Sequence, residues 1–539
     1  MIDLLSQAPG EVATDVPSSQ GSRGHAATFS RNSAISVGRL LISTLVGLVL
    51  PAYLTHKLPV QTYSAWVLIL QMSAYVGYLD FGVQTGIAKY VAEYEARGDF
   101  VGASMRASAG FAIISVTSIL GVLLTVVLAW RVPQLFHEMP ASLYRDVRIS
   151  LLFVGISLSF GLLCSIFSAV FLGLQRYGVP IILSLINRFL FTGVVVCAVF
   201  FRCSLAVMGA LVAVVQIATG LMQIGAWRKL ASNIRISLYG IDRDVLKKML
   251  SYCSALAVWT VGMLCVSGLD VTIVGRYDFP QTAFYSIATA PTNFMISIMG
   301  AALAPLLPTA SALSVHRGAK EMGEVLSRAT RYSTILLIFS ALPLLVGGYW
   351  VLRLWVGPHY AVQTIGYLRI LVLANLVRNL CLPYAGMLVA TENQRVAIAG
   401  ASAEAIVNVG SSIYLARHIG AVGVAYGTLL GAFVSVGMHF ALSMHYTYST
   451  FSVTRARLFL SGILRPTLVA IPSIASVALW WSAKAPSFSL PMWLLWASST
   501  TLLGWFGSLY PEERSRLLRL AKRRFGTLKP ALSGTSSRR

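Results

Sequence analysis

Residues 77–100 read GYLDFGVQTGIAKYVAEYEARGDF, and they mark the point at which an apolar helix leaves a membrane. The stretch that precedes them is apolar over the length of a spanning helix. Asp80 lies inside this helix, and charged residues follow from Lys89 onward. Similar switches from apolar to charged residues recur along the chain. They predict helical spans, because a backbone in lipid must satisfy its own hydrogen bonds.

The composition indicates the same class of protein. Of the 539 residues, 56% are hydrophobic and 11% are charged, whereas soluble chains have about 25% charged residues. The formal charge of +23 is typical of membrane proteins whose cytoplasmic loops are rich in Lys and Arg, so it does not predict nucleic-acid binding. The six cysteines have no metal-ligand spacing, and we expect no metal site.

Apolar segments of spanning length occur about fourteen times. They fall near 34–54, 62–86, 107–130, 149–173, 178–201, 204–226, 253–275, 283–308, 330–354, 363–389, 395–416, 420–445, 459–481 and 489–510. We therefore expect an all-α integral membrane protein with about fourteen transmembrane helices. With the N-terminus in the cytoplasm, about three times as many Lys and Arg residues lie on cytoplasmic segments as on the far side, so we expect both termini in the cytoplasm.

The chain also contains a weak internal repeat. Four pairs of segments resemble each other at an offset of roughly 215 to 221 residues, among them LGLQRYGVPI (172–181) and VATENQRVAI (389–398). The offset predicts two six-helix halves in tandem, related by an axis along the membrane normal. The expected order is a disordered cytoplasmic tail (1–33), an N-terminal half (34–226), a basic amphipathic cytoplasmic linker (227–252), a C-terminal half (253–445), two further helices (446–510) and a basic cytoplasmic tail (511–539).

Polar and charged residues inside the apolar segments are the candidates for a functional site, because a charge at the bilayer centre costs about 2.5 to 3.5 kcal/mol. Such residues tend to face a wet cavity or a partner charge. The candidates for substrate binding are Arg39, Ser184, Asn187, Arg188, Asn375, Arg378, Asn379, Glu404 and Asn408. Asp80 and Asp270 are candidates for gating, or for coupling to Na⁺ or H⁺. The alternative interpretation is internal ion pairing that holds helices together, for example between Arg188 and Glu404.

Five segments resemble the multidrug/oligosaccharidyl-lipid/polysaccharide (MOP) exporter superfamily, and within it the bacterial polysaccharide and O-antigen flippases of the Wzx type. They are YLDFGVQTGIAKYVAEYEARGD (78–99), FSAVFLGLQRYGVPI (167–181), SGLDVTIVGRYDFPQTAFYSIA (267–288), LPTASALSVHRG (307–318) and LRLWVGPHY (352–360). The resemblance covers about residues 34–450.

The resemblance implies a flippase that moves polyprenyl-pyrophosphate-linked oligosaccharides across the bacterial cytoplasmic membrane by alternating access, for O-antigen, capsule or exopolysaccharide synthesis. The implied partners are the lipid-linked oligosaccharide, membrane lipids, a glycan polymerase and glycosyltransferases. Arginine side chains would bind the pyrophosphate bidentately.

The absence of a Walker A sequence or another catalytic motif favours a transporter over an enzyme, with no cofactor beyond a coupling Na⁺ or H⁺. A lipid II flippase and a cation-coupled multidrug exporter of the same superfamily remain open alternatives. So do a membrane glycan polymerase or ligase and a scaffold for glycan enzymes.

Overall fold

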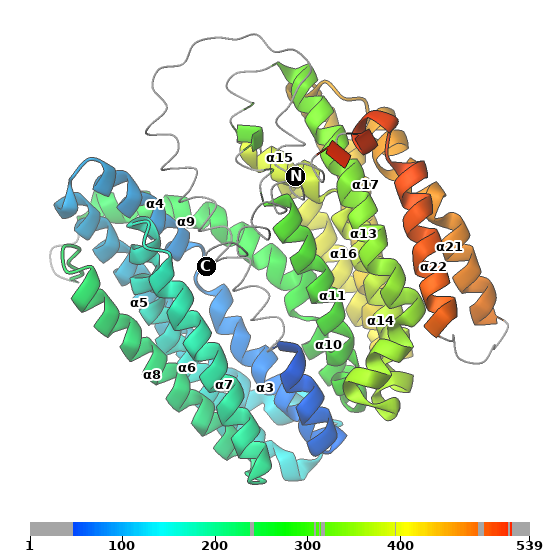
Figure 1. Ribbon diagram of the computed structural model, residues 1–539. Coiled ribbons are helices and arrows are strands. Elements are labelled where there is room, and N and C mark those ends of the chain that lie inside the picture. Colours follow the sequence, from blue (N-terminus) through cyan, green and yellow to red (C-terminus); the bar gives the residue numbers. More distant parts are fainter. Residues whose placement is uncertain are drawn as a thin grey trace, which may run out of the picture.

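The structure is a computed structural model that describes residues 47–237, 242–304, 306, 309–311, 313, 318–393, 395–482, 490–515 and 518–519. The regular secondary structure of these residues is entirely helical (Figure 1). Ten of their helices are long and apolar enough to cross a membrane, or eleven if one bent pair counts as a single span. The expected all-α, multi-pass membrane protein is confirmed. The count of fourteen spans stays a prediction, and the expected tail at 1–33 lies outside the described residues.

The N-terminal lobe is a bundle in which α5 packs on α6, α6 on α8, and α8 on α7. Its helices are residues 47–57, α3 (Val60–Tyr78), α4 (Val83–Ala96), α5 (Phe100–Leu135), α6 (Ala141–Gly173), α7 (Gly178–Phe200) and α8 (Leu205–Leu230). The bent pair is α3 and α4, whose axes differ by 41°. Phe81 and Gly82 adopt positive φ angles at the bend, so the two helices cannot be continuous there.

Gly82 is required at this bend for two reasons. Its φ of +77° is in the left-handed region, and a Cβ atom there would lie 2.5 Å from Leu256 Cδ1. We expect G82A to lower the free energy of unfolding by about 1 to 2 kcal/mol, measured by thermal or denaturant unfolding of the detergent-purified protein. G77A is the matched control, because no atom lies within 4 Å of its added methyl group. Equal stability of the two variants would contradict this explanation of the bend.

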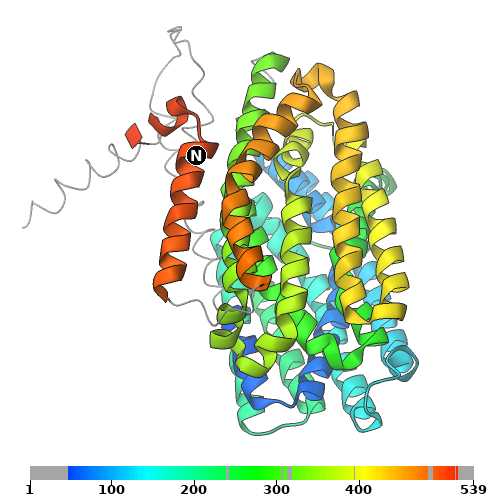
Figure 2. The ribbon, with the colours of Figure 1, turned by 90° about the vertical axis from the view of Figure 1, so that its right-hand side faces the viewer.

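The C-terminal lobe repeats the long, membrane-length helices of the first. Its elements are α9 (Arg243–Met263), η1 (Leu264–Gly268), α10 (Asp270–Tyr277), η2 (Phe279–Gln281), α11 (Thr282–Leu303), α13 (Ala319–Val356), α14 (Pro358–Asn379), α15 (Leu382–Ala390), α16 (Arg395–Ile419), α17 (Ala421–Met438), η3 (His439–Ser443) and α18 (Met444–Tyr446). The last part of the chain forms α19 (Tyr448–Phe451), α20 (Arg455–Arg457), η4 (Leu458–Leu464), α21 (Arg465–Ser482), α22 (Leu490–Leu503) and η5 (Gly504–Ser508). α21 and α22 flank the outside of the lobe beside α13 (Figure 2).

Two backbone turns occupy equivalent positions in the two repeated segments. After α6, Gln175 has a φ of +57°, and Arg176 N–H donates to Phe171 O at 2.9 Å. After α15, Glu392 has a φ of +59°, and Asn393 N–H donates to Leu388 O at 2.8 Å. Both are Schellman turns that end a helix. The two positive-φ residues are 217 positions apart, within the pair of similar segments, as expected for tandem halves.

The helix α9 passes from one lobe to the other (Figure 1). Its first half packs on α4 and α5, and its Met249 and Cys253 are buried in the core of the N-terminal lobe. The π-helix η1 and α10 pack on α16 and α17 of the C-terminal lobe, and they also contact α3 of the N-terminal lobe. The predicted boundary at residue 253 therefore does not coincide with a boundary between packed lobes.

Much of the predicted linker over 227–252 is helical. α8 continues to Leu230, and α9 begins at Arg243, so both ends of the expected linker belong to long helices. Of the residues between them, 231–237 run along α5, where Ser104 Oγ and Ser108 Oγ accept bonds from the backbone N–H groups of Arg235 and Ser237. The basic residues at the start of α9 obscured the helix in the sequence, because they interrupt its apolar character.

Hydrogen bonds join the lobes on the side opposite the predicted cytoplasmic face, here called the far side. Arg276 Nη1 donates to the carbonyl oxygens of Gln134 and Leu135 at 3.1 and 3.2 Å. Glu138 Oε2 accepts a bond from Phe279 N–H at 3.0 Å. The ribbons of the two lobes diverge toward the other side (Figure 1). The lobes are thus in contact at the far side.

Candidate functional site

The first group of predicted site residues lies on α7 in the N-terminal lobe. Asn187 is half-buried and donates through Nδ2 to Gln216 Oε1 of α8 at 3.1 Å. Ser184 and Arg188 are exposed on the protein surface of this helix, which in a membrane protein means exposed to lipid or to a water-filled space. The three residues therefore share a helix but not one environment.

Arg188 lies near the middle of α7 and is the most informative member of this group. Its guanidinium rests on Gly47, where an added Cβ atom would be 2.7 Å from Nη2. Among the described residues, no carboxylate or hydrogen-bond acceptor is paired with it. An arginine at this depth is costly without a partner, so a water molecule or an anion would stabilise Arg188.

The second group lies in the C-terminal lobe and centres on an ion pair. Arg378 of α14 donates through Nε to Glu404 Oε1 of α16 at 2.5 Å. The two side chains are 19% and 8% exposed, so the pair is mostly shielded from solvent. Arg378 Nη2 is buried and has no hydrogen-bond partner within the part of the chain that the structure describes. The alternative in which Glu404 pairs with Arg188 is wrong, because the carboxylate is held by an arginine of its own lobe.

Asp270 lies beside this ion pair, at the start of α10. Its carboxylate Oδ2 accepts hydrogen bonds from Thr428 Oγ1 at 3.0 Å and from Tyr285 Oη at 3.4 Å. Asp270 is 8% exposed, and Arg378 is the cation that acts on its charge. The C-terminal lobe thus buries two carboxylates around one guanidinium, which leaves an excess of one negative charge when both are ionised.

The predicted asparagines serve mainly the backbone. Asn375 and Asn379 are buried, and each donates to a carbonyl oxygen one turn back in α14. Asn408 of α16 donates through Nδ2 to Val266 O at 2.5 Å, while its Oδ1 accepts from Ser412 Oγ at 3.1 Å. Val266 belongs to the π-helix, where the widened turn frees a carbonyl group. Asn408 therefore stabilises the irregular part of the helix that connects the lobes.

Two other candidates occupy different positions. Arg39 lies outside the described residues. Asp80 lies in the bend between α3 and α4, and its Oδ1 accepts a bond from Gln84 N–H at 3.4 Å, so its carboxylate caps the start of α4. Asp80 and Asp270 belong to different lobes and do not form one site.

Sequence reasoning missed several residues around the buried charges. Thr428 and Tyr285 bind Asp270, and His439 lies within the electrostatic reach of Glu404. His439 is 8% exposed, with its ring edge against Tyr384. No local signal identifies these side chains, because hydroxyl groups and single histidines are common in apolar helices. The residues that they contact also lie in other helices, so no spacing along one helix indicates the contact.

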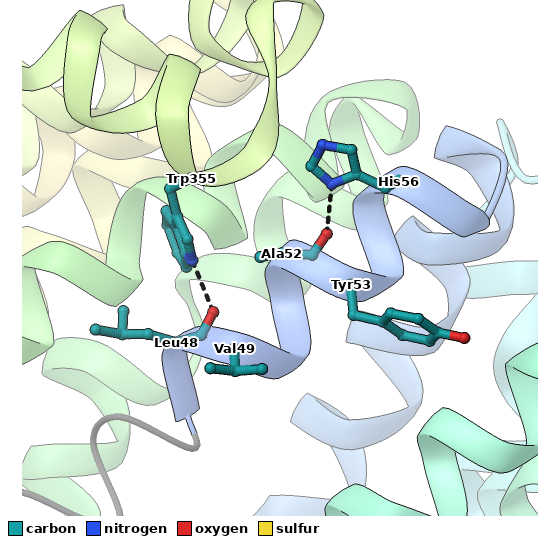
Figure 3. A pocket seen from close by; sticks show the side chains of 6 residues that line it. All are labelled: Leu48, Val49, Ala52, Tyr53, His56 and Trp355. Atoms are coloured by element: carbon teal, nitrogen blue, oxygen red, sulfur yellow. Dashed lines mark hydrogen bonds between the residues drawn. The ribbon is translucent and has the colours of Figure 1, made fainter.

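A separate apolar cavity of about 450 Å³ lies between the first described helix and the end of α13 (Figure 3). Trp355 Nε1 donates to Leu48 O at 2.7 Å across it, and His56 Nδ1 donates to Ala52 O at 2.7 Å at its edge. Its lining residues are Leu48, Val49, Ala52, Tyr53, His56 and Trp355. None of the predicted site residues that the structure describes lines this cavity, so it is distinct from both polar groups.

Comparison with solved structures places this arrangement in a known architecture. The chain is similar to the lipid II flippase MurJ in an inward closed conformation, with a TM-score of 0.68, 13% identity, and coverage of 88% of this chain and 98% of that one. The chain has the fold of the MOP superfamily transporters. It is also similar to an inward-facing multidrug resistance MATE family transporter of the MOP superfamily, with a TM-score of 0.64, 14% identity and coverage of 79% and 98%.

An outward-facing MATE family transporter of the MOP superfamily superposes less closely, with a TM-score of 0.58, 15% identity and coverage of 78% and 96%. No protein-family model and no curated protein sequence matches the chain. The structural relatives are transporters, so the MOP fold agrees with the expectation of a transporter rather than an enzyme. At identities of this size the likeness establishes the fold, and the substrate has to be argued from this chain's own residues.

Proposed function

We propose that the chain is a flippase that moves lipid-linked oligosaccharides with a polyprenyl-pyrophosphate head across the bacterial cytoplasmic membrane. The observation that carries the proposal is Arg188, an arginine near the middle of a spanning helix that has no carboxylate partner among the described residues. A pyrophosphate would provide the missing anion and would accept the parallel N–H groups of a guanidinium. Arg378, whose Nη2 has no partner among the residues that the structure describes, is the corresponding cation of the C-terminal lobe.

The arrangement of the lobes supports loading from the cytoplasmic side. The lobes are joined at the far side by Arg276 and Glu138, and their ribbons diverge on the other side. The inward closed lipid II flippase MurJ and the inward-facing MATE transporter superpose with TM-scores of 0.68 and 0.64, against 0.58 for the outward-facing MATE transporter. We infer that this conformation receives its substrate from the cytoplasm, and that rocking of the lobes releases it on the far side.

The charged residues of the two lobes also bear on the alternative substrates, organic cations and lipid II. A drug exporter for organic cations would be expected to have an acidic site, whereas here an unpaired arginine is the outstanding charge of the N-terminal lobe. The buried acids of the C-terminal lobe are partly compensated by Arg378. A lipid II flippase shares the pyrophosphate, so Arg188 does not separate it from an oligosaccharide flippase. That distinction depends on the sugar and requires the experiment below.

The proposal is tested by complementation in bacterial strains that each lack their own polysaccharide flippase or lipid II flippase. Return of surface polysaccharide with a fall in the lipid-linked precursor is the expected result, and the responding strain gives the substrate class. Rescue of only the lipid II strain would replace the oligosaccharide by lipid II. Raised resistance to cationic dyes, with precursor levels unchanged in every strain, would favour a drug exporter instead.

Arg276 is expected to control closure at the far side. R276Q removes two charge-assisted bonds to the end of α5, so the population open to the far side should increase several-fold. The measurement uses S64C in a background without other cysteines and follows its labelling by an impermeant maleimide. Ser64 is buried at the inter-lobe contact with Ala283, so the maleimide reaches this position when the far side opens. R202Q, a change at an exposed helix end, is the control. Unchanged labelling would remove Arg276 from the closure of the far side.

Asp270 is the proposed carrier for a coupling H⁺ or Na⁺, because its buried carboxylate leaves the excess negative charge noted above. D270N should abolish the dependence of transport on the ion gradient in proteoliposomes while leaving substrate binding measurable. T428V, which removes one hydrogen-bond donor to Asp270 but keeps the charge, should retain a dependence on the gradient. Gradient dependence that persists in D270N would assign the coupling to another residue, such as Glu404 or Asp80.

A further inference from the structure

A cluster of arginines lies where the last helices meet α13, on the predicted cytoplasmic side and away from the residues discussed so far. Arg331 of α13 is 5% exposed, and its Nη2 is paired with Glu513 Oε1 of the segment that follows η5. Arg465, the first residue of α21, donates through Nε to Gly507 O at 3.0 Å. Three elements that are distant in sequence therefore converge here.

One aromatic ring joins these two arginines. Arg331 Cζ lies 4.4 Å from the centroid of the Tyr510 ring, and Arg465 Cζ lies 4.1 Å from the same centroid. The backbone N–H of Tyr510 donates to Glu513 Oε2 at 2.9 Å. Both guanidinium groups therefore contact the same ring, and Glu513 is paired with that of Arg331. Two positive charges around one side chain attract an anion.

The charges of the cluster do not balance. Arg328 and Arg514 are half-buried beside the same elements, and Glu513 is the carboxylate that forms an ion pair among the described residues of the cluster. Glu512 is exposed and accepts a bond only through its backbone, and Glu324 likewise accepts Arg328 Nε through its carbonyl oxygen. The described residues of these elements thus have four arginines and one carboxylate in an ion pair, and that carboxylate pairs with Arg331.

Two of these guanidinium groups also have unused donors. Arg331 Nε and Arg514 Nε are both buried, and neither has a hydrogen-bond partner among the described residues. The Arg331 side chain is only 6% exposed. A buried donor without an acceptor costs about 1 to 3 kcal/mol. An oxyanion from outside the chain would accept such bonds and would balance the excess charge.

We propose that Arg331, Arg465 and Arg514 form a binding site for a lipid phosphate group at the cytoplasmic membrane surface. Arginine suits this ligand because its planar fork matches phosphate oxygens, and anionic headgroups are concentrated at that surface. In this site Glu513 occupies one guanidinium and competes with the lipid for it. The phosphate would connect α13 to the two last helices and so fix them to the C-terminal lobe. The site lies away from Arg188, Arg378 and Asp270, so it can be tested separately from the proposed transport site.

The phosphate has two sources, a bulk anionic phospholipid or a polyprenyl-pyrophosphate substrate, and the test separates them. The full-length chain in phosphatidylcholine nanodiscs is titrated with phosphatidylglycerol in one arm and with geranylgeranyl pyrophosphate in the other, and bound lipid is measured by native mass spectrometry. Tighter binding of phosphatidylglycerol identifies the phospholipid, whereas binding of the pyrophosphate alone identifies the substrate.

The variants distinguish a lipid site from a purely structural contact. R465Q should weaken binding about tenfold, the factor for one lost charge-assisted hydrogen bond, and R465K should weaken it less. E513Q should tighten binding, because it removes the competing carboxylate. The matched control is R457Q, an exposed arginine eight residues before Arg465 on the same segment, which should leave binding unchanged. Each variant is first checked for thermal unfolding.

Two outcomes would overturn the proposal. The first is that neither phosphate-bearing lipid binds the unaltered chain more tightly than phosphatidylcholine does. The second is that E513Q weakens binding as R465Q does, which would show that the cluster only holds the last helices in place.

Discussion

Replacing Arg188 by Gln is expected to reduce flipping of the lipid-linked substrate about tenfold to hundredfold, with little change in stability. The reduction follows because Arg188 has no acceptor among the described residues, so its donors remain for the ligand. Stability should change little, since no internal ion pair is broken. R188K should retain part of the activity, because a lysine keeps the charge but loses the bidentate geometry.

Transport of a fluorescent polyprenyl-pyrophosphate analogue into proteoliposomes measures this effect. R202Q, which changes an exposed arginine just after the same helix, serves as the control and should transport normally. If R188Q transports at the rate of the control, the pyrophosphate does not bind Arg188, and the proposed substrate loses its main support.

The second large effect concerns stability. E404A leaves the Arg378 guanidinium buried without its partner, and we expect the free energy of unfolding to fall by about 3 to 5 kcal/mol. The double variant R378M/E404L replaces both charges by apolar side chains of similar length, so its stability should lie within about 1 kcal/mol of the unaltered chain. Denaturant unfolding of the detergent-purified proteins gives both values.

The same pair of variants separates structure from transport. If Arg378 binds the pyrophosphate head, R378M/E404L should be stable but inactive in proteoliposomes. Normal transport by this folded double variant would show that the ion pair only supports the lobe. A stable E404A would instead indicate that water reaches Arg378 and replaces the lost carboxylate.

The fold class was predictable because it depends on features that each segment carries by itself. Apolar length identified the helices, and the repeated segments around Gln175 and Glu392 have the same backbone turn. The course of α9 was not predictable, because a helix that packs half on each lobe has no distinctive periodicity. Its basic start was interpreted as part of a surface linker, although the helix begins there.

The candidate site was predictable only in its residue types. Charges inside spans identified Arg188, Arg378 and Glu404, but the spacing along one helix does not determine which helix lies opposite. Glu404 was considered as a partner for Arg188, and the structure pairs it with Arg378. The predicted basic tail over 511–539 likewise contains Glu513 near its start, and Glu513 is 8% exposed and paired with Arg331. Partners this far apart in sequence leave no local pattern.

The course of α9 has a consequence for the order in which the chain is assembled. The N-terminal lobe leaves a surface on α4 and α5, at Gly86 and Gly110, that is filled by Met249 of α9. During synthesis this lobe is therefore incomplete when α8 has entered the membrane, and it is completed only by the first helix of the following half. The two halves repeat each other in sequence, yet the first cannot mature before translation of the second has begun.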